Sequence, residues 1–393
     1  MNPTIYLDHN ATTPVHPEVL EAMEPSWREF YGNPSSIHQG GVMAARELRR
    51  ARREVASFLG VEEESEIVFT SGGTESNNAV LRSAVSSGKG KRRIVTSSVE
   101  HSSVLKTVRA LEGEGGRTAY VPVSAEGNLD REKFRESLTD DTALVSVMMA
   151  NNETGVIFPI AEIGKEVHDK GILFHVDAVQ AVGKISLSLK TLPVDFLSLS
   201  AHKFGGPKGI GALYIRKGVP FRPLLFGGSQ ERGQRAGTEN MPGITGLGAA
   251  CARLQKVFSD ENQKVSELRN YFEEAILSRI SGVQVNGNRT SRLPNTSNLA
   301  FEGVDTEALL ILLDQEGIYA SSGSACLSGA PEPSHVLKAM GFLDTRAKNS
   351  VRFSFGLENT FEEADEVIRL LERFVTRLRE IELEEQHPHS VVQ

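Results

Sequence analysis

The alternation of short apolar runs with amphipathic stretches constrains the fold of this chain more than any other feature. Six runs rich in Val, Ile, Leu and Phe have the composition of buried strands, and they span residues 66–70, 93–98, 142–150, 172–178, 195–201 and 211–216. Helical patterns lie between them, such as residues 102–115 and 161–171, and the second of these ends at a glycine. Strands that alternate with helices predict an α/β fold, with a mainly parallel sheet that helices cover on both faces.

The pattern changes near residue 255, where a second region begins. One helical face there carries Val265, Leu268, Phe272, Ile276 and Ile280. Short strands are expected at 283–287, 296–303 and 351–356, mixed with helices at 306–317, 334–341 and 361–385. We therefore expect a large domain over residues 14–259 and a smaller α/β domain formed by residues 1–13 and 260–393.

Charge and cysteine content exclude several classes of protein. The net charge of −8 disfavours a nucleic-acid-binding surface. The first residues, MNPTIYLDHN, lack the regions of a signal peptide, and no apolar run is long enough for a membrane span. Two cysteines far apart form no disulfide framework and no zinc–thiolate site of their own. We therefore expect a cytoplasmic protein without a metal of its own and without nucleic-acid or membrane partners.

The two cysteines have different surroundings. Cys326 lies in SSGSACLSG, residues 321–329, among the glycines and serines typical of a mobile segment. From these residues alone it is either a reactive thiol on a loop or an accident of composition. Cys251 lies in GLGAACARLQ, among alanine and leucine in a helical pattern, and a packing role is the better interpretation.

A lysine follows one of the predicted strands directly. In SAHKFGGPKG, residues 200–209, Lys203 comes just after the apolar run, where partial burial lowers the pKa of an amine. Such a lysine can attack a carbonyl and form a Schiff base. Ser200 and His202 beside it can donate hydrogen bonds to an anion. The alternative is an ordinary surface lysine in a turn, because GGPKG is itself a turn sequence.

Three further motifs end other predicted strands. Asp177, in HVDAVQA, is a carboxylate that suits a protonated pyridine nitrogen, or else an ordinary ion pair or helix cap. Gly73 and Thr74, in TSGGTESNNAV, offer bare amides and a hydroxyl at a helix start, which can hold a phosphate. His101, in SSVEHSSV, can stack on a flat cofactor, although a lone histidine is more often a capping or surface residue.

These four motifs together predict a cofactor pocket. They all follow predicted strands, and ligands in open α/β sheets bind at the carboxyl ends of the strands. A lysine, a carboxylate for a ring nitrogen, a phosphate cradle and a stacking histidine together indicate pyridoxal 5'-phosphate.

The same motifs carry a resemblance to a known family. The chain resembles the NifS/IscS-type cysteine desulfurases, which belong to the class V aminotransferase group and have fold type I. The matching segments, in family order, are YLDHNATTPVHP, YGNPSSIHQGG, SGGTESNN, EHSSV, NNETG, HVDAVQ, SAHKFGGPKG, GGSQERGQRAGTEN, SSGSACLSG and VRFSFG. They span nearly the whole chain. The resemblance implies a large cofactor-binding domain and a small domain that carries the catalytic cysteine.

The resemblance also implies roles for the cofactor-binding residues. Lys203 is expected to form the Schiff base, Asp177 to pair with the pyridine nitrogen, and Gln180 to contact the phenolic oxygen. His101 is expected to stack on the ring and to share in catalysis. The residues expected to hold the phosphate are Gly73, Thr74, Ser200, His202 and, from the second subunit of a homodimer, Thr238.

A second set of implied roles concerns the substrate and its sulfur. Arg352, helped by Asn33, is expected to bind the carboxylate of L-cysteine, and Asn152 to lie beside cofactor and substrate. Cys326 is expected to take the sulfur as a persulfide, which leaves L-alanine. Leu327, where close relatives often have threonine, departs from the family pattern without touching this chemistry. Gly205, where relatives often have histidine or tyrosine, is a second such departure.

The expected partner is a protein that accepts sulfur. The resemblance implies an iron–sulfur scaffold of the IscU/NifU kind or a tRNA-thiolation enzyme, and Cys326 as a transient ligand of a cluster shared with the scaffold. Two other enzymes of fold type I remain alternatives, an aminotransferase and a selenocysteine lyase. A partner-binding relative without catalysis would be expected to lack the lysine or the cysteine, and both are present.

Overall fold

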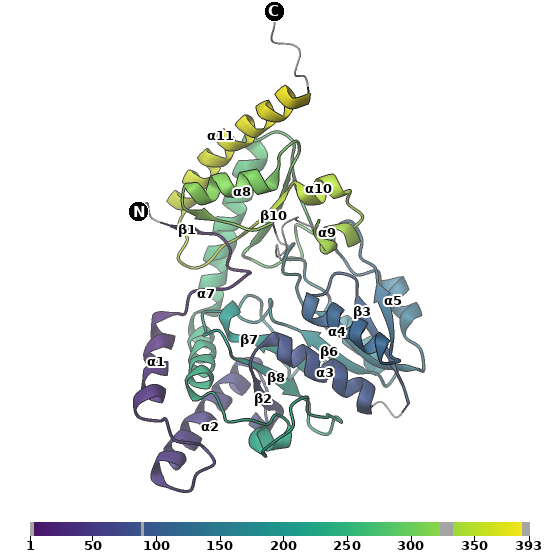
Figure 1. The fold of residues 1–393 in the computed structure, drawn as a ribbon, viewed down its shortest axis with the longest axis vertical. Helices are drawn as coiled ribbons and strands as arrows, with labels where there is room; N and C mark the ends of the chain where they lie inside the picture. Colours follow the sequence, from purple (N-terminus) through teal and green to yellow (C-terminus); the bar gives the residue numbers. More distant parts are fainter. Residues whose placement is uncertain (1–3, 88–89, 323–332, 387–393) are drawn as a thin grey trace, which may run out of the picture.

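A seven-stranded sheet forms the centre of the larger part of the protein. The computed structural model describes residues 4–87, 90–322 and 333–386, and Figure 1 shows their arrangement. The strand order is β2-β8-β7-β6-β5-β3-β4. The strands are β2 (Ile67–Thr70), β3 (Arg93–Ser97), β4 (Arg117–Val121), β5 (Thr142–Met148), β6 (Leu173–Asp177), β7 (Phe196–Ser200) and β8 (Gly211–Ile215).

Most of this sheet is parallel, as the strand and helix alternation predicts. Neighbours from β4 to β7 pair in parallel, whereas β8 pairs antiparallel with both β7 and β2. The six predicted strands are all present. Strand β4 escapes the sequence pattern because it is an edge strand whose residues are mostly exposed or half-buried, so it lacks an apolar run.

Helices cover both faces of the large sheet. One face packs against α3 (Gly73–Ser87) and α4 (Ser102–Gly113), through a cluster that includes Val80 and Val108. The other face carries a larger cluster, with residues such as Val55 and Ile163. The helices on that side are α2 (Gln39–Leu59), α5 (Arg131–Ser137), α6 (Ile160–His168) and the first part of α7 (Met241–Arg279). Helix α1 (Pro17–Arg28) packs beside α7.

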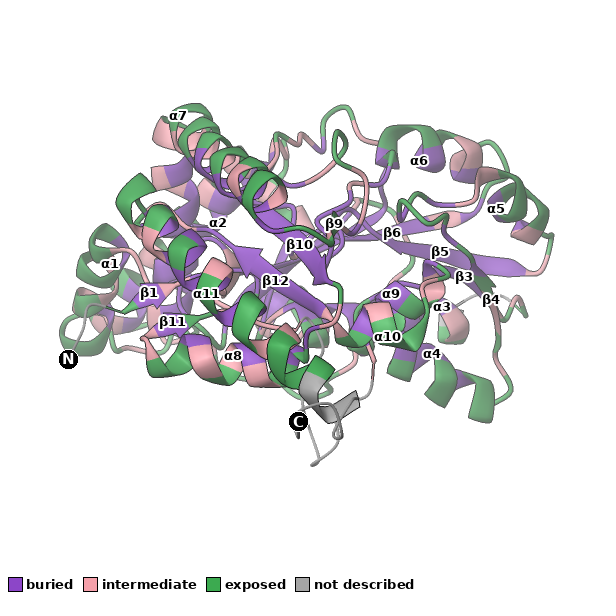
Figure 2. Ribbon diagram, turned by 90° about the horizontal axis from the view of Figure 1, so that it is seen from above, coloured by how far each residue is buried: buried purple, intermediate pink, exposed green. Residues whose placement is uncertain are grey.

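The smaller part of the protein is built on a three-stranded antiparallel sheet. Strand β10 (Thr296–Phe301) lies between β9 (Val283–Val285) and β12 (Ser350–Ser354). The N-terminal strand β1 (Ile5–Tyr6) pairs in parallel with β11 (Ile318–Tyr319). The other elements here are α8 (Thr306–Gln315), α9 (His335–Ala339), α10 (Asp344–Lys348) and α11 (Phe361–Gln386). The central strands of both sheets are buried, and the outer faces of the helices are exposed (Figure 2).

Helix α7 joins the two parts without a break. Its first half contributes Leu247 and Leu254 to the core of the large sheet, and its second half contributes Leu268 and Phe272 to the core of the small one. The boundary expected at residues 259 and 260 therefore falls inside a helix of 39 residues. Helix α9 lies on the small-domain side of that boundary in sequence, yet Val336 and its neighbours pack on the large core.

Two features of the fold position a site between the two parts. The carboxyl ends of β3, β5, β6 and β7 meet at one edge of the large sheet, because parallel strands run in the same direction. Strand β12 of the small sheet, with the segment that follows β1, lies over this edge, and Asp8 bridges to Ser354 there. Among the described residues, no helix is long and apolar enough to cross a membrane.

Candidate active site

A cavity of about 540 Å³ lies where these elements meet. Residues from the ends of the large-sheet strands, from the N-terminal segment and from β12 line it. Ten of the residues predicted from the sequence are among them, namely Gly73, Thr74, His101, Asn152, Asp177, Gln180, Ser200, His202, Lys203 and Arg352. The structure therefore brings together side chains that are spread over most of the chain.

Lys203 lies one turn beyond β7, at the carboxyl edge of the sheet. Its Nζ donates hydrogen bonds to the carbonyl oxygens of Asn10 (2.6 Å) and Ala11 (2.8 Å). Burial, with the positive charge of Arg352, lowers the pKa of this amine to about 8. A lysine with this pKa is partly neutral near neutral pH and can act as a nucleophile, which agrees with the sequence-based expectation.

Asp177, the last residue of β6, presents a buried carboxylate to the cavity. It is 6% exposed. Its Oδ2 accepts a hydrogen bond from the Asn77 side chain (2.7 Å), and its Oδ1 accepts one from the Val179 backbone (3.0 Å). Both donors are neutral, so a ligand with a protonated ring nitrogen would supply the cation that a buried carboxylate prefers.

His101 caps the start of α4 and opens onto the cavity. The backbone N–H of Ser103 donates to its Nδ1 (3.1 Å), so the neutral ring carries its proton on Nε2. Desolvation by the surrounding protein lowers the pKa of His101, with a further contribution from the charge of Lys203, although Asp177 opposes the shift. The ring is therefore neutral near pH 7, and it serves as a helix cap as well as a wall of the cavity.

The start of α3 forms the end of the cavity that suits a phosphate. Gly73 begins this helix and Thr74 follows, so free backbone N–H groups point out of the first turn. A Cβ on Gly73 would approach Val179 to 2.5 Å, which explains the need for glycine. Ser200 and His202 line the same cavity. Burial and nearby lysines lower the pKa of His202 to about 4, so its ring is neutral near pH 7 and has one N–H group that can donate a hydrogen bond.

Gln180 belongs to a buried polar cluster beside Lys203. Its Nε2 donates to the carbonyl oxygen of Asn10 (2.8 Å), and its Oε1 accepts from Lys184 Nζ (2.7 Å). Lys184 also donates to the side chain of Asn10 (3.3 Å). Burial lowers the pKa of Lys184 well below its usual value.

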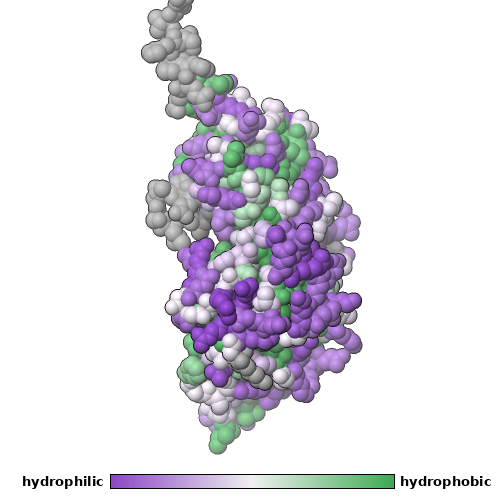
Figure 3. All heavy atoms as spheres, turned by 90° about the vertical axis from the view of Figure 1, so that its right-hand side faces the viewer, coloured by the Kyte–Doolittle hydropathy of each residue, from purple (hydrophilic) through white to green (hydrophobic). Residues whose placement is uncertain are grey.

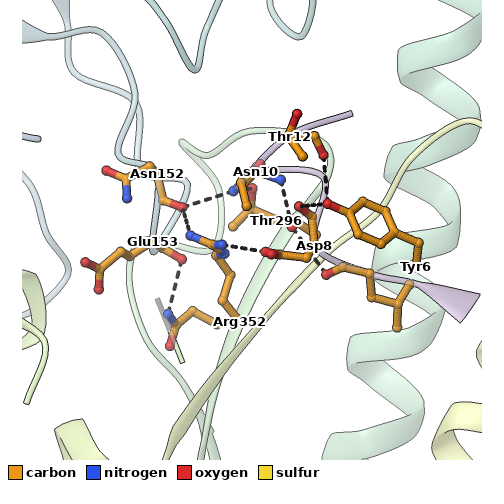
Figure 4. A network of polar contacts seen from close by, with 12 residues as sticks. Tyr6, Asp8, Asn10, Thr12, Asn152, Glu153, Thr296 and Arg352 are labelled. Carbon is orange, nitrogen blue, oxygen red and sulfur yellow. Dashed lines mark hydrogen bonds and ion pairs between the residues drawn. The ribbon is translucent and has the colours of Figure 1, made fainter. Parts of the chain in front are cut away.

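Arg352 forms the opposite wall, from the middle of β12. Its guanidinium donates to Asp8 Oδ1 (2.6 Å) and to the carbonyl oxygen of Asn152 (3.0 Å), as Figure 4 shows. The side chain of Asn10 donates to the same carbonyl oxygen (3.1 Å) and to Thr296 (2.8 Å). The small sheet and the N-terminal segment thus hold Arg352 against the large domain.

Two predicted residues do not line the cavity, and a third lies outside the described residues. Asn33 is exposed in the connection between α1 and α2, where its Oδ1 accepts a hydrogen bond from the Ser35 backbone, so it does not assist Arg352 within one chain. Thr238 is exposed between η3 (Gln230–Gly233) and α7, outside the cavity lining. Cys326, with Leu327, lies outside the described residues.

Several cavity residues were not predicted individually. Asp8 and Asn10 lie within the YLDHNATTPVHP motif, and Asn77 lies within SGGTESNN, but nothing local distinguishes them from neighbouring polar residues. Ser103 also lines the cavity, as the second residue of α4. The signal that could have found Asn77 is its spacing, because it lies four residues after Gly73 and faces the same side of α3.

Cys251 does not line this cavity. It is fully buried in α7, and burial raises the pKa of its thiol. This confirms the interpretation of Cys251 as a packing residue. Among the described residues, no group of three or more His, Cys, Asp or Glu side chains could hold a metal ion.

The residues present fit pyridoxal 5'-phosphate. A nucleophilic lysine, a buried carboxylate, a bare helix start and a stacking imidazole line one cavity. Within the part of the chain that the structure describes, Asn77 Oδ1 and Arg352 Nε are buried polar atoms without a hydrogen-bond partner, so the cavity wall has capacity for a polar ligand. Lys203 would hold the cofactor covalently, Asp177 its ring nitrogen, and the α3 start its phosphate.

Comparison with known proteins places the chain in a family. A family model described as aminotransferase class-V matches residues 5–367. The chain belongs to the class-V aminotransferase family. The curated relatives include a cysteine desulfurase of Trichormus azollae, 52% identical over 95% of this chain and 94% of the relative. Another is the cysteine desulfurase NifS of Azotobacter vinelandii, 48% identical over 96% of this chain and 94% of the relative.

Solved structures show the same relationship. A NifS-like protein superposes with a TM-score of 0.90 at 41% identity, and covers 95% of this chain and 100% of that one. DndA from Streptomyces lividans superposes with a TM-score of 0.77 at 39% identity, over 88% of this chain and 98% of that one. These matches confirm the predicted fold type I architecture and the resemblance to NifS-type proteins. As a class-V aminotransferase of this type, the chain uses pyridoxal phosphate.

Proposed function

We propose that this cavity converts L-cysteine to L-alanine and that the sulfur passes to Cys326. The activity is that of a pyridoxal-phosphate-dependent cysteine desulfurase, because curated relatives of about half identity over nearly the whole chain carry that name. These relatives do not favour the aminotransferase or selenocysteine lyase alternatives. The observation that supports the residue roles is the single cavity that holds Lys203, Asp177 and Arg352.

Each wall of the cavity has its own task in this proposal. When bound, pyridoxal phosphate withdraws electrons from the substrate Cα, which weakens the bond between Cβ and sulfur. Lys203 Nζ, with a pKa of about 8, gives and takes protons near neutral pH. Arg352 binds the substrate carboxylate, and Asn152 fixes the guanidinium through its carbonyl oxygen. Together they orient the amino acid between the two parts of the protein.

The sulfur transfer balances without an added oxidant. L-Cysteine and the Cys326 thiol give L-alanine and a Cys326 persulfide, because the sulfur leaves Cβ while Cβ gains a proton and an electron pair. A later reductant supplies two electrons, releases sulfide and restores the thiol. A thiolate is the required nucleophile, so Cys326 acts in its deprotonated form.

We also propose that the sulfur leaves on an acceptor protein. The acceptor is an IscU/NifU-type scaffold or a tRNA-thiolation enzyme, because either can receive sulfur from a protein persulfide. If the acceptor is the scaffold, Cys326 is also a transient ligand of the cluster that the two proteins share. Persulfide transfer to a purified scaffold, followed by mass spectrometry of the scaffold, tests this. Absence of both binding and transfer would remove the scaffold from the proposal.

We propose a cytoplasmic location from the cysteine content, and cell fractionation checks it.

A homodimer completes the site in this proposal. Thr238 and Asn33 are exposed in the single chain and lie outside its cavity, as expected of residues that act on a second copy. Large apolar side chains are exposed on α1 and on the segment that carries Asn33, with Trp27 at 67%, Tyr31 at 79% and Ile37 at 99% exposure. Figure 3 shows apolar surface at the lower tip of the molecule, where Figure 1 places the connection between α1 and α2 and the start of α2. Light scattering that gives a fully active monomer would contradict the dimer.

Product analysis with two cysteine variants tests the proposed function. Purified protein is given L-cysteine and a reductant, and sulfide and alanine are measured together. We expect equal amounts of both, and we expect both to vanish in Cys326→Ala. Cys251→Ala is the matched control, because it removes the buried cysteine of α7 and should keep the activity. Full activity in Cys326→Ala would exclude Cys326 as the sulfur carrier.

A further inference from the structure

The guanidinium of Arg352 already carries a carboxylate. Its NH2 donates to Asp8 Oδ1 at 2.6 Å, and its NH1 donates to the carbonyl oxygen of Asn152 at 3.0 Å. Asp8, Asn152 and Arg352 all line the cavity, and Figure 4 shows Asp8 pointing at the guanidinium. An amino-acid carboxylate bound by Arg352 must therefore share the guanidinium with Asp8 or displace it.

The contact between Asp8 and Arg352 is incomplete. The hydrogen bond from Arg352 reaches one carboxylate oxygen, Oδ1, whereas a carboxylate and a guanidinium can make two parallel hydrogen bonds. Arg352 Nε is buried and has no hydrogen-bond partner among the described residues. A substrate carboxylate that takes NH2 and Nε together would satisfy this donor, which Asp8 leaves unpaired.

Burial explains why a carboxylate is needed at Arg352 when substrate is absent. The Arg352 side chain is only 5% exposed, and a buried charge without a partner is costly. The amines of Lys203 and Lys184 lie near enough for the charge of Arg352 to lower their pKa values. Without Asp8, and with no substrate bound, this guanidinium would lie near other cationic groups with no carboxylate beside it.

Asp8 is placed so that its side chain can move while its backbone stays fixed. Its carbonyl oxygen accepts hydrogen bonds from the Ala11 backbone (2.9 Å) and from the Tyr6 hydroxyl (3.1 Å), and the residue bridges to Ser354 of β12. The Asp8 side chain is 21% exposed, far more than that of Arg352. Rotation of the carboxylate towards solvent therefore costs less than movement of the arginine.

We propose that Asp8 is a specificity-determining residue that stands in for the substrate carboxylate on Arg352 and is displaced when the amino acid binds. It competes with substrate and product for one guanidinium, so it sets their affinity and favours release of L-alanine. This inference rests on the proposed function, because it takes Arg352 as the carboxylate-binding residue.

The test compares the holoenzyme with its Asp8→Asn variant. The probes are L-alanine, which has the carboxylate without the thiol, and L-alaninamide, which lacks the carboxylate. Binding is measured by isothermal titration calorimetry, and the KM for L-cysteine is measured in parallel. We expect Asp8→Asn to lower the Kd for L-alanine and the KM for L-cysteine about tenfold, the size of one charge-assisted hydrogen bond. The affinity for L-alaninamide should not change.

The unliganded protein gives a second readout. Without a ligand, Asp8→Asn leaves the Arg352 guanidinium without a carboxylate partner, so the Tm of the variant should fall. Saturating L-alanine should then raise the Tm of the variant by more than that of the wild type. Asp8→Ser serves if Asp8→Asn fails to fold. The matched control is Asp141→Asn, which removes an Asp–Arg pair with Arg117 (2.7 Å) at the amino-terminal edge of the large sheet and should change neither constant.

The outcomes separate this inference from the proposed function. If the wild type turns over L-cysteine and Asp8→Asn binds L-alanine equally or more weakly, Asp8 only positions Arg352 and the inference is overturned. If the wild type neither binds L-alanine nor turns over L-cysteine, the proposed function fails, and the inference fails with it. A fall in Kd for L-alaninamide as large as that for L-alanine would also overturn it, because the effect would not involve the carboxylate.

Discussion

The two walls of the cavity are built in different ways. The large-domain wall comes from short motifs, each at the end of its own strand, such as Asp177 after β6 and Lys203 after β7. The other wall joins residues 344 positions apart, because Asp8 meets Arg352 only when β1 and β12 come together in the small domain. Local sequence therefore determines the first wall, and tertiary folding determines the second. The predictions below separate the contributions of the two walls.

The largest effect should come from the large-domain wall. Lys203→Arg keeps a positive charge but removes the amine nucleophile, so we expect desulfuration of L-cysteine to fall at least about a thousandfold. Lys208→Arg is the matched control, because Lys208 is an exposed lysine in the same turn and should keep its activity. Alanine formation from L-cysteine is the measurement, and substantial turnover by Lys203→Arg would show that this wall does not supply the essential group.

A smaller effect should come from the small-domain wall. Arg352→Lys keeps the charge but loses the planar set of donors that contacts Asp8 and Asn152. We expect the KM for L-cysteine to rise about 30- to 100-fold with a smaller change in kcat, because the lost contact binds substrate and transition state alike. Steady-state kinetics checks this. A fall in kcat at constant KM would instead place Arg352 in the chemistry of the large-domain wall.

The charge of one wall should tune the titration of the other. Burial and the positive charge of Arg352 together lower the pKa of Lys203 to about 8, whereas the negative charge of Asp8 opposes this shift. Only the neutral amine attacks a carbonyl, so the rate at which the apoprotein takes up pyridoxal phosphate should rise with pH through about 8 and then level off. Arg352→Leu should move this midpoint upward and Asp8→Asn downward. Stopped-flow absorbance measures the midpoint, and identical midpoints in all three proteins would show that the walls are not coupled.

The smallest effect concerns Glu100, which contacts the large-domain wall by accepting a hydrogen bond from the backbone of Met148, a residue that lines the cavity. Burial raises the pKa of this carboxyl to about 8, against hydrogen bonds from Ser97 and Met148 that favour the charged form. Between its usual pKa and about 8 the folded state binds more protons than the unfolded state, so this group contributes stability at low pH that is lost as the pH rises through 8.

Glu100→Gln should remove that dependence. The amide can replace the protonated carboxyl, since Oε2 has no hydrogen-bond partner among the described residues. We expect a Tm within about 3 °C of the wild type near pH 6 and a flatter fall in Tm between pH 6 and 8. Differential scanning calorimetry across this range checks it. An equally steep fall in Glu100→Gln would assign the dependence to other groups.

The same difference between the walls decides what the sequence could predict. Lys203, Asp177, His101 and Gly73 were predictable because each comes at or just after the end of an apolar run whose composition identifies a buried strand, and parallel strands share one edge. The roles of Arg352 and Asn152 came from the family resemblance alone. Asp8, Asn10 and Lys184 were missed, because their importance depends on contacts between segments that no local pattern connects.

The fold shows the same limit. Central strands such as β5 and β6 were predictable from their apolar runs, because burial on both faces leaves a clear composition. Edge strand β4 was not, since its residues are mostly exposed or half-buried. Helix α7 passes through both cores, so its sequence changes character near residue 255 while its backbone continues without a break.

The most direct test of the account is a crystal structure of the holoenzyme with L-alanine bound. The account predicts that one amino acid contacts both walls, with its carboxylate on Arg352 and its amino nitrogen on the Lys203 side of the cavity. It also predicts that the Asp8 carboxylate has turned away from the guanidinium. A structure in which the L-alanine carboxylate binds away from Arg352, while Asp8 is still paired with Arg352, would contradict the account.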